Sequence, residues 1–92
     1  MKIIRINALW CSGCLSMKKI WKDIEKEYPN LDIETYDYDM DKVVVEKYNV
    51  GKILPVIIFK NNEDEIRLIG EKTKDEIIKV IEDLTWKQKY YY

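Results

Sequence analysis

Apolar side chains recur with two different periods along the chain, and the changes of period divide it into elements. Residues 2–8 alternate apolar and polar positions and are rich in isoleucine, which predicts a β-strand. From Cys14 onward the apolar positions follow the spacing of an amphipathic helix, at Met17, Ile20, Trp21, Ile24 and Tyr28. Pro29 and Asn30 end this helix. Residues 31–38 alternate again and predict a second strand.

The segment Asp41–Asn49 is compatible with two structures. Its three consecutive valines, residues 43–45, favour a strand. However, Val44, Val45 and Tyr48 also share one face of a short helix. We favour the helix, and we expect it to end at Gly51.

The second half of the chain predicts a hairpin and a terminal helix. Residues 53–59 form an apolar run that contains Pro55, and residues 61–64 turn the chain into a partner strand at residues 65–69. After Gly70, Thr73 and Glu76 have the spacing of a capping box. An amphipathic helix follows, with apolar positions at Ile77, Ile78, Ile81 and Leu84.

The predicted order is therefore β-α-β-α-β-β-α. A parallel pair joined by a crossover helix and followed by a hairpin means a mixed four-stranded sheet with helices on both faces, an α/β fold. A chain of 92 residues supports one domain, which we place at residues 1–86. Residues 87–92 end in three tyrosines and are assigned as a C-terminal tail with no recognisable pattern.

Composition excludes several function classes. The formal net charge is -1, which favours neither a nucleic-acid surface nor a polybasic membrane patch. Arg5 and Asn7 interrupt the apolar N-terminus, and no run approaches a membrane span, so we expect a cytoplasmic protein. The chain has no histidine, which removes the usual general base and the commonest metal ligand.

The two cysteines are the most informative residues. They stand in the motif Trp10-Cys11-Ser12-Gly13-Cys14, between the first strand and the first helix. A thiolate at a helix N-terminus is stabilised by free backbone N–H groups, which lowers the pKa of the thiol. Cys14 lies one helical turn on, close enough to attack a mixed disulfide formed by Cys11. In a cytoplasmic protein this spacing indicates a redox-active or a metal-binding pair.

The spacing of the two cysteines is also compatible with a copper(I) site. Small copper chaperones also carry Cys-x-x-Cys at a strand-to-helix junction, and two thiolates suit copper(I). That family usually has a Met where this chain has Leu9, and its β-α-β-β-α-β fold has no place for residues 51–70. A structural zinc site is not expected, because zinc takes four ligands and the chain offers two cysteines and no histidine. We therefore predict no metal.

The combination of motifs resembles the thioredoxin family in its minimal form, over residues 2–85. The resemblance rests on the Trp10-Cys-x-x-Cys motif, on Leu54-Pro55 at the start of a buried strand, and on Gly70 between the hairpin and the last helix. It implies a thioredoxin-like fold and a protein-disulfide oxidoreductase. It also implies that Cys11 is the exposed nucleophile and Cys14 the buried resolving thiol.

The resemblance also implies roles for residues around the pair. Trp10 would be an aromatic platform beside the site, although a Trp that simply packs at the sheet edge is an alternative. A cis peptide bond would join Leu54 to Pro55, and the backbone of Leu54 would pair with an extended substrate segment. The alternative is a proline tolerated at the first position of a strand.

The chain departs from the family pattern in two places. The dipeptide Ser12-Gly13 replaces the common Gly-Pro, so the redox potential does not carry over. Arg5 stands where many thioredoxins have a buried acid that assists the resolving thiol. Arg5 either packs or pairs with an acid, or else lies near the sulfurs and favours the thiolate. Water, Asp37 or Asp39 would then take the proton of Cys14.

We therefore expect a thiol–disulfide oxidoreductase that reduces protein disulfides through Cys11 and Cys14. It would work as a monomer without a cofactor beyond the Cys11–Cys14 disulfide, and a separate reductase would recharge it. A glutaredoxin-like variant that uses glutathione remains open within this class. A copper(I) carrier and an inactive interaction module with the same fold are the alternatives.

Overall fold

A computed structural model of the protein describes the backbone of residues 1–90 and the side chains of residues 1–85. The elements, in chain order, are β1 (Lys2–Asn7), α1 (Ser12–Ser16), α2 (Lys18–Glu27), β2 (Asp32–Asp37), α3 (Lys42–Lys47), β3 (Val56–Asn61), β4 (Asp64–Ile69) and α4 (Lys74–Tyr90). The predicted order is confirmed, except that the first helix is divided in two.

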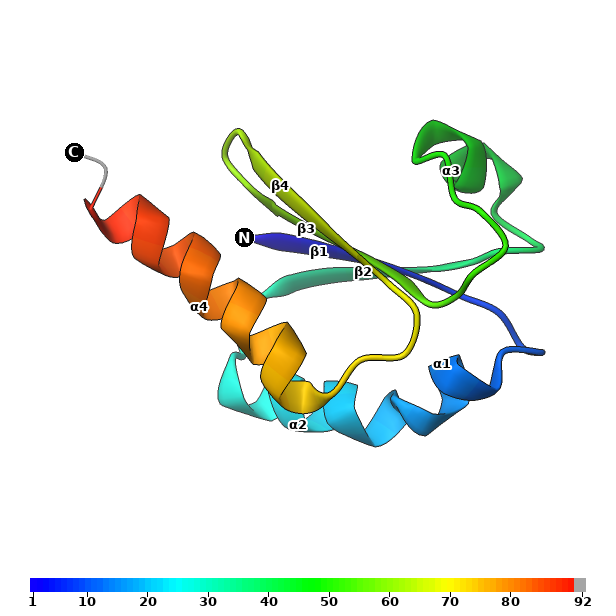
Figure 1. Ribbon diagram of the computed structural model, residues 1–92, viewed down its shortest axis with the longest axis horizontal. Coiled ribbons are helices and arrows are strands. Elements are labelled where there is room, and N and C mark those ends of the chain that lie inside the picture. The colour runs from blue at the N-terminus through cyan, green and yellow to red at the C-terminus, as the bar shows by residue number, and fades with distance from the viewer. Residues whose placement is uncertain (91–92) are drawn as a thin grey trace.

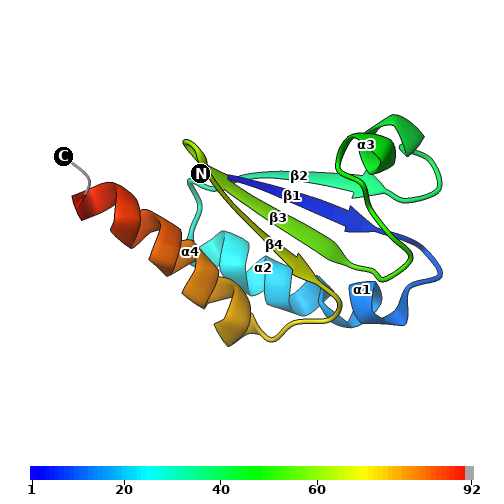
Figure 2. The same cartoon turned by 45° about the horizontal axis from the view of Figure 1, so that its top comes forward.

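The four strands form one mixed sheet in the order β2-β1-β3-β4. β1 pairs in parallel with β2 and antiparallel with β3, and β3 pairs antiparallel with β4. The helices α2 and α4 cover one face of the sheet, and α3 covers the other (Figures 1 and 2). This arrangement confirms the predicted α/β fold with helices on both faces.

Alternation along the strands sends side chains into two separate cores. On the face covered by α2 and α4, the buried side chains are Ile3, Met17, Trp21, Ile24, Ile57, Phe59, Ile77, Ile81 and Leu84. On the face covered by α3, they are Ile4, Ile6, Val56 and Ile58. Arg5 and Asn7 have the same parity along β1 as Ile3, so they belong to the α2 face.

The break between α1 and α2 falls at Met17, which is buried at 1% exposure. No proline or glycine marks it, so the sequence pattern predicts one continuous helix. The Met17 N–H still donates to the Gly13 carbonyl at 3.3 Å, and the Trp21 N–H donates to the Met17 carbonyl at 3.1 Å. The two helices therefore continue one another along the same face of the sheet.

α3 confirms the helical interpretation of the valine-rich segment. Val44, Val45 and Tyr48 pack against the sheet, whereas Val43 is 81% exposed. The prediction that Gly51 ends this helix is wrong, because Asn49 adopts a positive φ of 51° directly after Tyr48. The Val50 N–H then donates to the Val45 carbonyl at 3.0 Å, which satisfies a terminal carbonyl of the helix.

The hairpin is tighter than predicted. Asn61 and Asp64 are already paired in β3 and β4, so the turn has only Asn62 and Glu63 at its tip, and Asn62 has a φ of 57°. Asn61 is buried, and its Nδ2 donates to the Leu84 carbonyl at 3.1 Å. This bond joins the far end of β3 to α4.

The last helix begins as the capping pattern predicts. The Glu76 N–H donates to Thr73 Oγ1 at 3.2 Å, immediately before α4. The backbone of α4 then runs through Tyr90, so most of the segment predicted as a tail is helical. Residues 91–92 of that tail lie outside the described residues. Within the described part of the chain, no helix is both long enough and apolar enough to cross a membrane.

Candidate functional site

Cys11 caps the helix in which Cys14 lies. β1 ends at Asn7, and the chain turns so that the Cys11 N–H donates to the Ala8 carbonyl at 3.2 Å. Cys11 is the N-cap of α1, and its Sγ accepts the backbone N–H of Cys14 at 3.1 Å. A helix-terminal N–H directed at Sγ favours its thiolate form, which is the nucleophile in disulfide exchange.

The two sulfurs are joined in a disulfide, with Cα atoms 5.3 Å apart. The expected contrast between an exposed Cys11 and a buried Cys14 is wrong for this oxidised form, since they are 7% and 6% exposed. Tyr38 and Leu54 pack against the cluster that the two cysteines form with Ala8. The asymmetry between the cysteines lies in their neighbours rather than in their burial.

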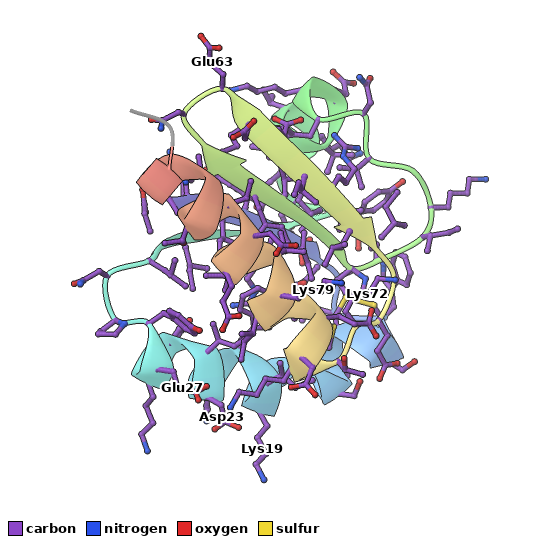
Figure 3. All side chains as sticks on the ribbon, turned by 60° about the vertical axis from the view of Figure 1, so that its left-hand side comes forward. Lys19, Asp23, Glu27, Glu63, Lys72 and Lys79 are labelled. Carbon is purple, nitrogen blue, oxygen red and sulfur yellow. A yellow bond between two sulfur atoms is a disulfide. The ribbon has the colours of Figure 1, made fainter. Side chains whose placement is uncertain are left out.

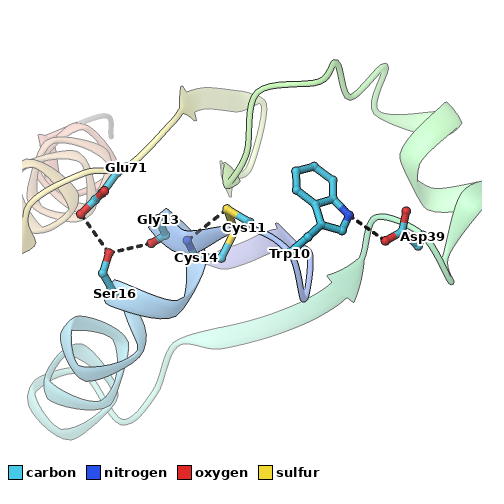
Figure 4. Close-up of a disulfide and its surroundings, with 7 residues drawn as sticks. All are labelled: Trp10, Cys11, Gly13, Cys14, Ser16, Asp39 and Glu71. Atoms are coloured by element: carbon cyan, nitrogen blue, oxygen red, sulfur yellow. Dashed lines mark hydrogen bonds between the residues drawn. A yellow bond between two sulfur atoms is a disulfide. The ribbon is translucent and has the colours of Figure 1, made fainter.

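Trp10 stands beside the disulfide and is 59% exposed. Its Nε1 donates to Asp39 Oδ2 at 2.9 Å (Figure 4). Its ring meets Tyr38 edge-on, with centroids 6.0 Å apart. A Trp that served only to pack at the sheet edge would be covered. The ring is instead an aromatic surface that is exposed, held by Asp39 and Tyr38, and adjacent in sequence to Cys11.

The structure brings the proline loop to the same place. The peptide bond between Leu54 and Pro55 is cis, the isomer that the resemblance implies. Pro55 is buried. It lies beside the motif, with its Cδ 3.8 Å from the position that a Cβ on Gly13 would occupy. The Gly70 N–H donates to the Pro55 carbonyl at 2.8 Å, so the β4–α4 loop is joined to the site as well.

Glu71 and Ser16 belong to the surroundings of the motif and were not predicted from the sequence. Ser16 Oγ donates to Glu71 Oε2 at 2.9 Å and also contacts the Gly13 carbonyl at 3.0 Å. The Cβ of Glu71 lies 3.4 Å from a Cβ built on Gly13, whereas Ser12 is exposed. The position of Glu71 directly after Gly70 was the available signal, because Gly70 was already assigned to the family pattern.

Arg5 lies between β2 and β3, paired with Thr35 and Ile57, on the α2 face. Its guanidinium carbon is 4.6 Å from the centre of the Trp21 ring, a cation–π contact. Its Nε is buried and has no hydrogen-bond partner among the described residues. Burial lowers the pKa of Arg5, and the charge of Glu25 opposes this effect.

Arg5 and Cys14 line the same small pocket of about 170 Å³. Its walls carry charged groups of both signs together with the inner cysteine: Arg5, Asn7, Ala8, Leu9, Cys14, Leu15, Lys18 and Asp37. Of the two aspartates considered from the sequence, Asp37 lines this cavity and Asp39 instead holds Trp10. The volume suffices for several water molecules.

The described side chains contain no group of three or more Cys, Asp or Glu residues arranged to hold a metal ion. What the geometry offers is a dithiol at a helix N-terminus, a cis-proline loop against it and an exposed aromatic ring beside it. This is the site of a protein that exchanges disulfides.

Comparisons with known proteins agree with that class. The family model for thioredoxin matches residues 1–83. A thioredoxin from Chlamydia trachomatis is 32% identical over 79 residues, covering 86% of this chain and 78% of that protein. Thioredoxin H5 of rice is 26% identical and covers 79% of this chain and 54% of its own length.

Solved structures show the same fold. A malaria-parasite thioredoxin-2, described as a component of the parasite's protein secretion machinery, superposes with a TM-score of 0.80 at 23% identity, covering 89% of this chain and 81% of that chain. Mitochondrial thioredoxin 3 of Saccharomyces cerevisiae gives a TM-score of 0.78 at 22% identity, covering 89% and 76%.

The chain belongs to the thioredoxin family. It is a protein-disulfide oxidoreductase that acts on disulfide-containing proteins by dithiol exchange through Cys11 and Cys14. The copper-chaperone alternative required a β-α-β-β-α-β fold, and the observed element order and sheet are different.

Proposed function

We propose that Cys11 is the attacking thiol and Cys14 the resolving thiol of this oxidoreductase. The observation that carries the assignment is the N-cap position of Cys11, whose Sγ accepts the Cys14 N–H at 3.1 Å. This bond favours negative charge on Cys11. Cys14 lies inside α1 at 6% exposure and lines the pocket that also contains Arg5 and Asp37.

The exchange proceeds in two steps. The Cys11 thiolate attacks one sulfur of a substrate disulfide, a mixed disulfide forms, and the first substrate thiolate leaves and takes a proton from solvent. Cys14 then loses its proton and attacks Cys11 Sγ. The Cys11–Cys14 disulfide forms, and the second substrate thiolate leaves. Two electrons pass from the dithiol to the substrate.

The proton of Cys14 leaves through the cavity behind it. Asp37 is the carboxylate on the cavity wall, and it lies opposite Asn7 in the pairing of β1 with β2. Its Oδ1 accepts the N–H groups of Asp39 and Met40 at 2.9 and 3.0 Å, which hold it in place. We assign Asp37, through water in the cavity, as the proton acceptor. Arg5 and Lys18 add positive charge that favours the Cys14 thiolate.

Substrates dock across the proline loop and the aromatic ring. Leu54 packs against the cluster that contains the cysteines, and it directly precedes the cis Pro55, which supports a role for its backbone in pairing with an extended segment around the substrate cystine. Trp10 supplies exposed aromatic surface on the other side of Cys11. Main-chain pairing gives affinity for many sequences rather than for one.

The partners of the cycle follow from the chemistry. The two cysteines are the only ones in the sequence, so a separate reductase must return the two electrons. One chain brings together both cysteines, Leu54 and Pro55, which supports action as a monomer without a cofactor beyond the disulfide. A dithiol kept reduced in this way suits a reducing compartment such as the cytoplasm.

The test is the reduction of a protein disulfide with dithiothreitol as electron source. We expect Cys11→Ser to abolish catalysis, because the attacking thiol is lost. Cys14→Ser should form a covalent adduct with the substrate that mass spectrometry detects and that added thiol releases. Val43→Ser places the same new side chain on the exposed side of α3 and should behave as the unmodified protein.

Two results would contradict the assignment. Full activity in Cys14→Ser would remove the resolving role. An adduct carried by Cys14 in the Cys11→Ser variant, formed as fast as the one on Cys11, would mean that the two cysteines have exchanged roles.

A further inference from the structure

Two carboxylates are tied to the redox motif, one on each side of the disulfide. Asp39, in the turn after β2, accepts the Trp10 indole N–H at 2.9 Å. Glu71, in the loop after β4, accepts the Ser16 hydroxyl at 2.9 Å. Figure 4 shows Asp39 and Glu71 at opposite ends of the site, with Cys11 between them. The motif itself therefore holds a negative charge at each end.

Both charges are fixed before any partner arrives. Ser16 Oγ also lies 3.0 Å from the Gly13 carbonyl, so its one proton is shared between the two acceptors, and Glu71 Cβ lies 3.4 Å from the position of a Cβ on Gly13. On the other side, the Asp39 N–H donates to Asp37 Oδ1 at 2.9 Å, and the Trp10 ring rests on Tyr38. Groups that are already ordered lose little conformational entropy on binding.

Neither charge is neutralised by the described side chains. The ion pairs found among the side chains of residues 1–85 are Lys2–Glu34, Lys60–Glu65 and Lys74–Glu27, and neither Asp39 nor Glu71 takes part in one. Lys52 and Lys72 occupy the same loops as the site, but they are also outside these pairs. Lysine carries its charge on a long, flexible and strongly hydrated stem, which moves aside more easily than a hydrogen-bonded carboxylate.

Apolar surface lies between the two carboxylates. Trp10 is 59% and Ile53 65% exposed, and Ile53 Cγ2 lies 3.9 Å from the position of a Cβ on Gly70, next to Glu71. Exposed large side chains at an established site are contact surface for a partner. The site therefore presents an apolar centre between two acidic ends.

We propose that this arrangement selects substrates whose cystine has basic residues on both flanks. The inference rests on the proposed function, because it requires the substrate to lie across Cys11 between Trp10 and Gly13. Opposite charges at exposed positions accelerate the encounter and fix the orientation, and added salt weakens both effects. We expect the selectivity to change kcat/KM for the different substrates and to leave the chemical steps of exchange unchanged.

The experiment uses three disulfide-bridged peptides that differ only beside the cystine, with Lys, Gln or Glu on both flanks. The rate of reduction at low salt gives kcat/KM for each, with dithiothreitol as electron source. We expect the Lys peptide to be preferred over the Glu peptide, with each carboxylate contributing about two- to five-fold. The preference should fall close to one in ~1 M salt, where the screening length is about 3 Å.

Four variants locate the effect. Glu71→Gln and Asp39→Asn keep the hydrogen bonds to Ser16 and Trp10 and remove the charge, so each should lower the preference and together abolish it. Ser16→Ala keeps the charge of Glu71 but frees it, which should give an intermediate preference. Glu63→Gln removes the same charge at the tip of the β3–β4 hairpin, at the end of both strands opposite Pro55 and Gly70 (Figure 3), and should change nothing.

The outcomes separate the two proposals. Failure of the unmodified protein to reduce the Gln peptide would overturn the proposed function. Reduction of all three peptides at equal rates, or an equal loss of preference in Glu63→Gln, would overturn the selectivity alone and leave the exchange mechanism intact.

Discussion

The two cysteines have nearly equal burial but different surroundings. Around Cys11, which we call the outer side, stand Trp10 with Asp39, Pro55, and Glu71 with Ser16. Around Cys14, which we call the inner side, the cavity brings together Arg5, Lys18 and Asp37. The outer side is built from residues of four loops and of α1, whereas the inner side is a pocket of about 170 Å³ lined mainly by β1, its following loop and the first two helices.

This difference separates two tasks that one disulfide must perform. A substrate protein needs exposed, fixed contacts, and the outer side supplies them through hydrogen bonds to the motif. In the proposed mechanism the proton of Cys14 needs only water and a titratable group, and Asp37 on the inner side is the group that we assign. Changes on the outer side should therefore alter substrate choice, and changes on the inner side should alter the pH dependence of the second step.

Removal of the Asp37 carboxylate from the inner side should have the largest effect on the difference between the two sides. Asp37→Asn retains an oxygen that accepts the Asp39 and Met40 N–H groups, but it no longer accepts a proton. We expect resolution of the mixed disulfide to slow by about ten-fold or more, with most of the loss at low pH, where little Cys14 thiolate exists. Stopped-flow measurement with a fluorescent disulfide substrate would separate this step from the attack by Cys11.

Asp39→Asn is the matched control, because it changes the same residue type two positions further on, outside the cavity. Its resolution step should keep the pH profile of the unmodified protein. If the two variants have the same profile, Asp37 has no special access to Cys14 and the assigned proton path is wrong.

The outer side was more accessible to sequence reasoning than the inner side. Cys11, Leu54-Pro55 and Gly70 each mark a change of element, so their neighbours are constrained by chain direction alone. These segments lie close together in the structure because the parallel pair β1–β2 and the hairpin β3–β4 belong to one sheet. Even the valine-rich α3 followed, because two of its valines and Tyr48 share the buried face.

The inner side depends on tertiary contacts that local patterns do not encode. Arg5 was assigned two roles from the sequence, and the structure places it in contact with Trp21 and on the cavity that Cys14 lines. The same limit applies to one contact of the outer side, the bond between Ser16 and Glu71, which joins residues 55 positions apart. The break at Met17 likewise falls at a buried residue without a helix-breaking neighbour.

Two glycines sharpen the description of the outer side, since they border the site for different reasons. Gly70 has a φ of 93°, a conformation unfavourable for residues with a Cβ, and its N–H holds Pro55. Gly70→Ala should lower the free energy of unfolding by about 1–2 kcal/mol.

Gly13 lies within α1, and a Cβ there would meet Glu71 at 3.4 Å. Gly13→Ala should raise stability by about 0.5 kcal/mol.

Chemical denaturation of the oxidised form measures both changes under identical conditions. Equal effects of the two substitutions would show that backbone conformation does not distinguish these positions. A loss of stability in Gly13→Ala would mean that Glu71 is held too firmly by Ser16 to yield to a methyl group.

A similarly small effect is expected from the charge of Arg5 on the inner side. Burial outweighs the attraction of Glu25 in setting the pKa of Arg5, and the Arg5 Nε lacks a partner, so the charged form is disfavoured by the fold. Arg5→Met keeps a long side chain against Trp21 and removes the unsatisfied donor. We expect the free energy of unfolding to rise by about 0.5–1 kcal/mol, a value discounted for the remaining solvent exposure of the guanidinium.

The same variant distinguishes a packing role from an electrostatic one. If the positive charge favours the Cys14 thiolate, then Arg5→Met raises the pKa of that thiol, and the resolution step moves to higher pH. Titration of the thiolate absorbance in Arg5→Met and Arg5→Lys measures this, since Lys retains the charge without the planar contact to Trp21. A changed stability with an unchanged thiolate titration in both variants would leave Arg5 as a packing residue only.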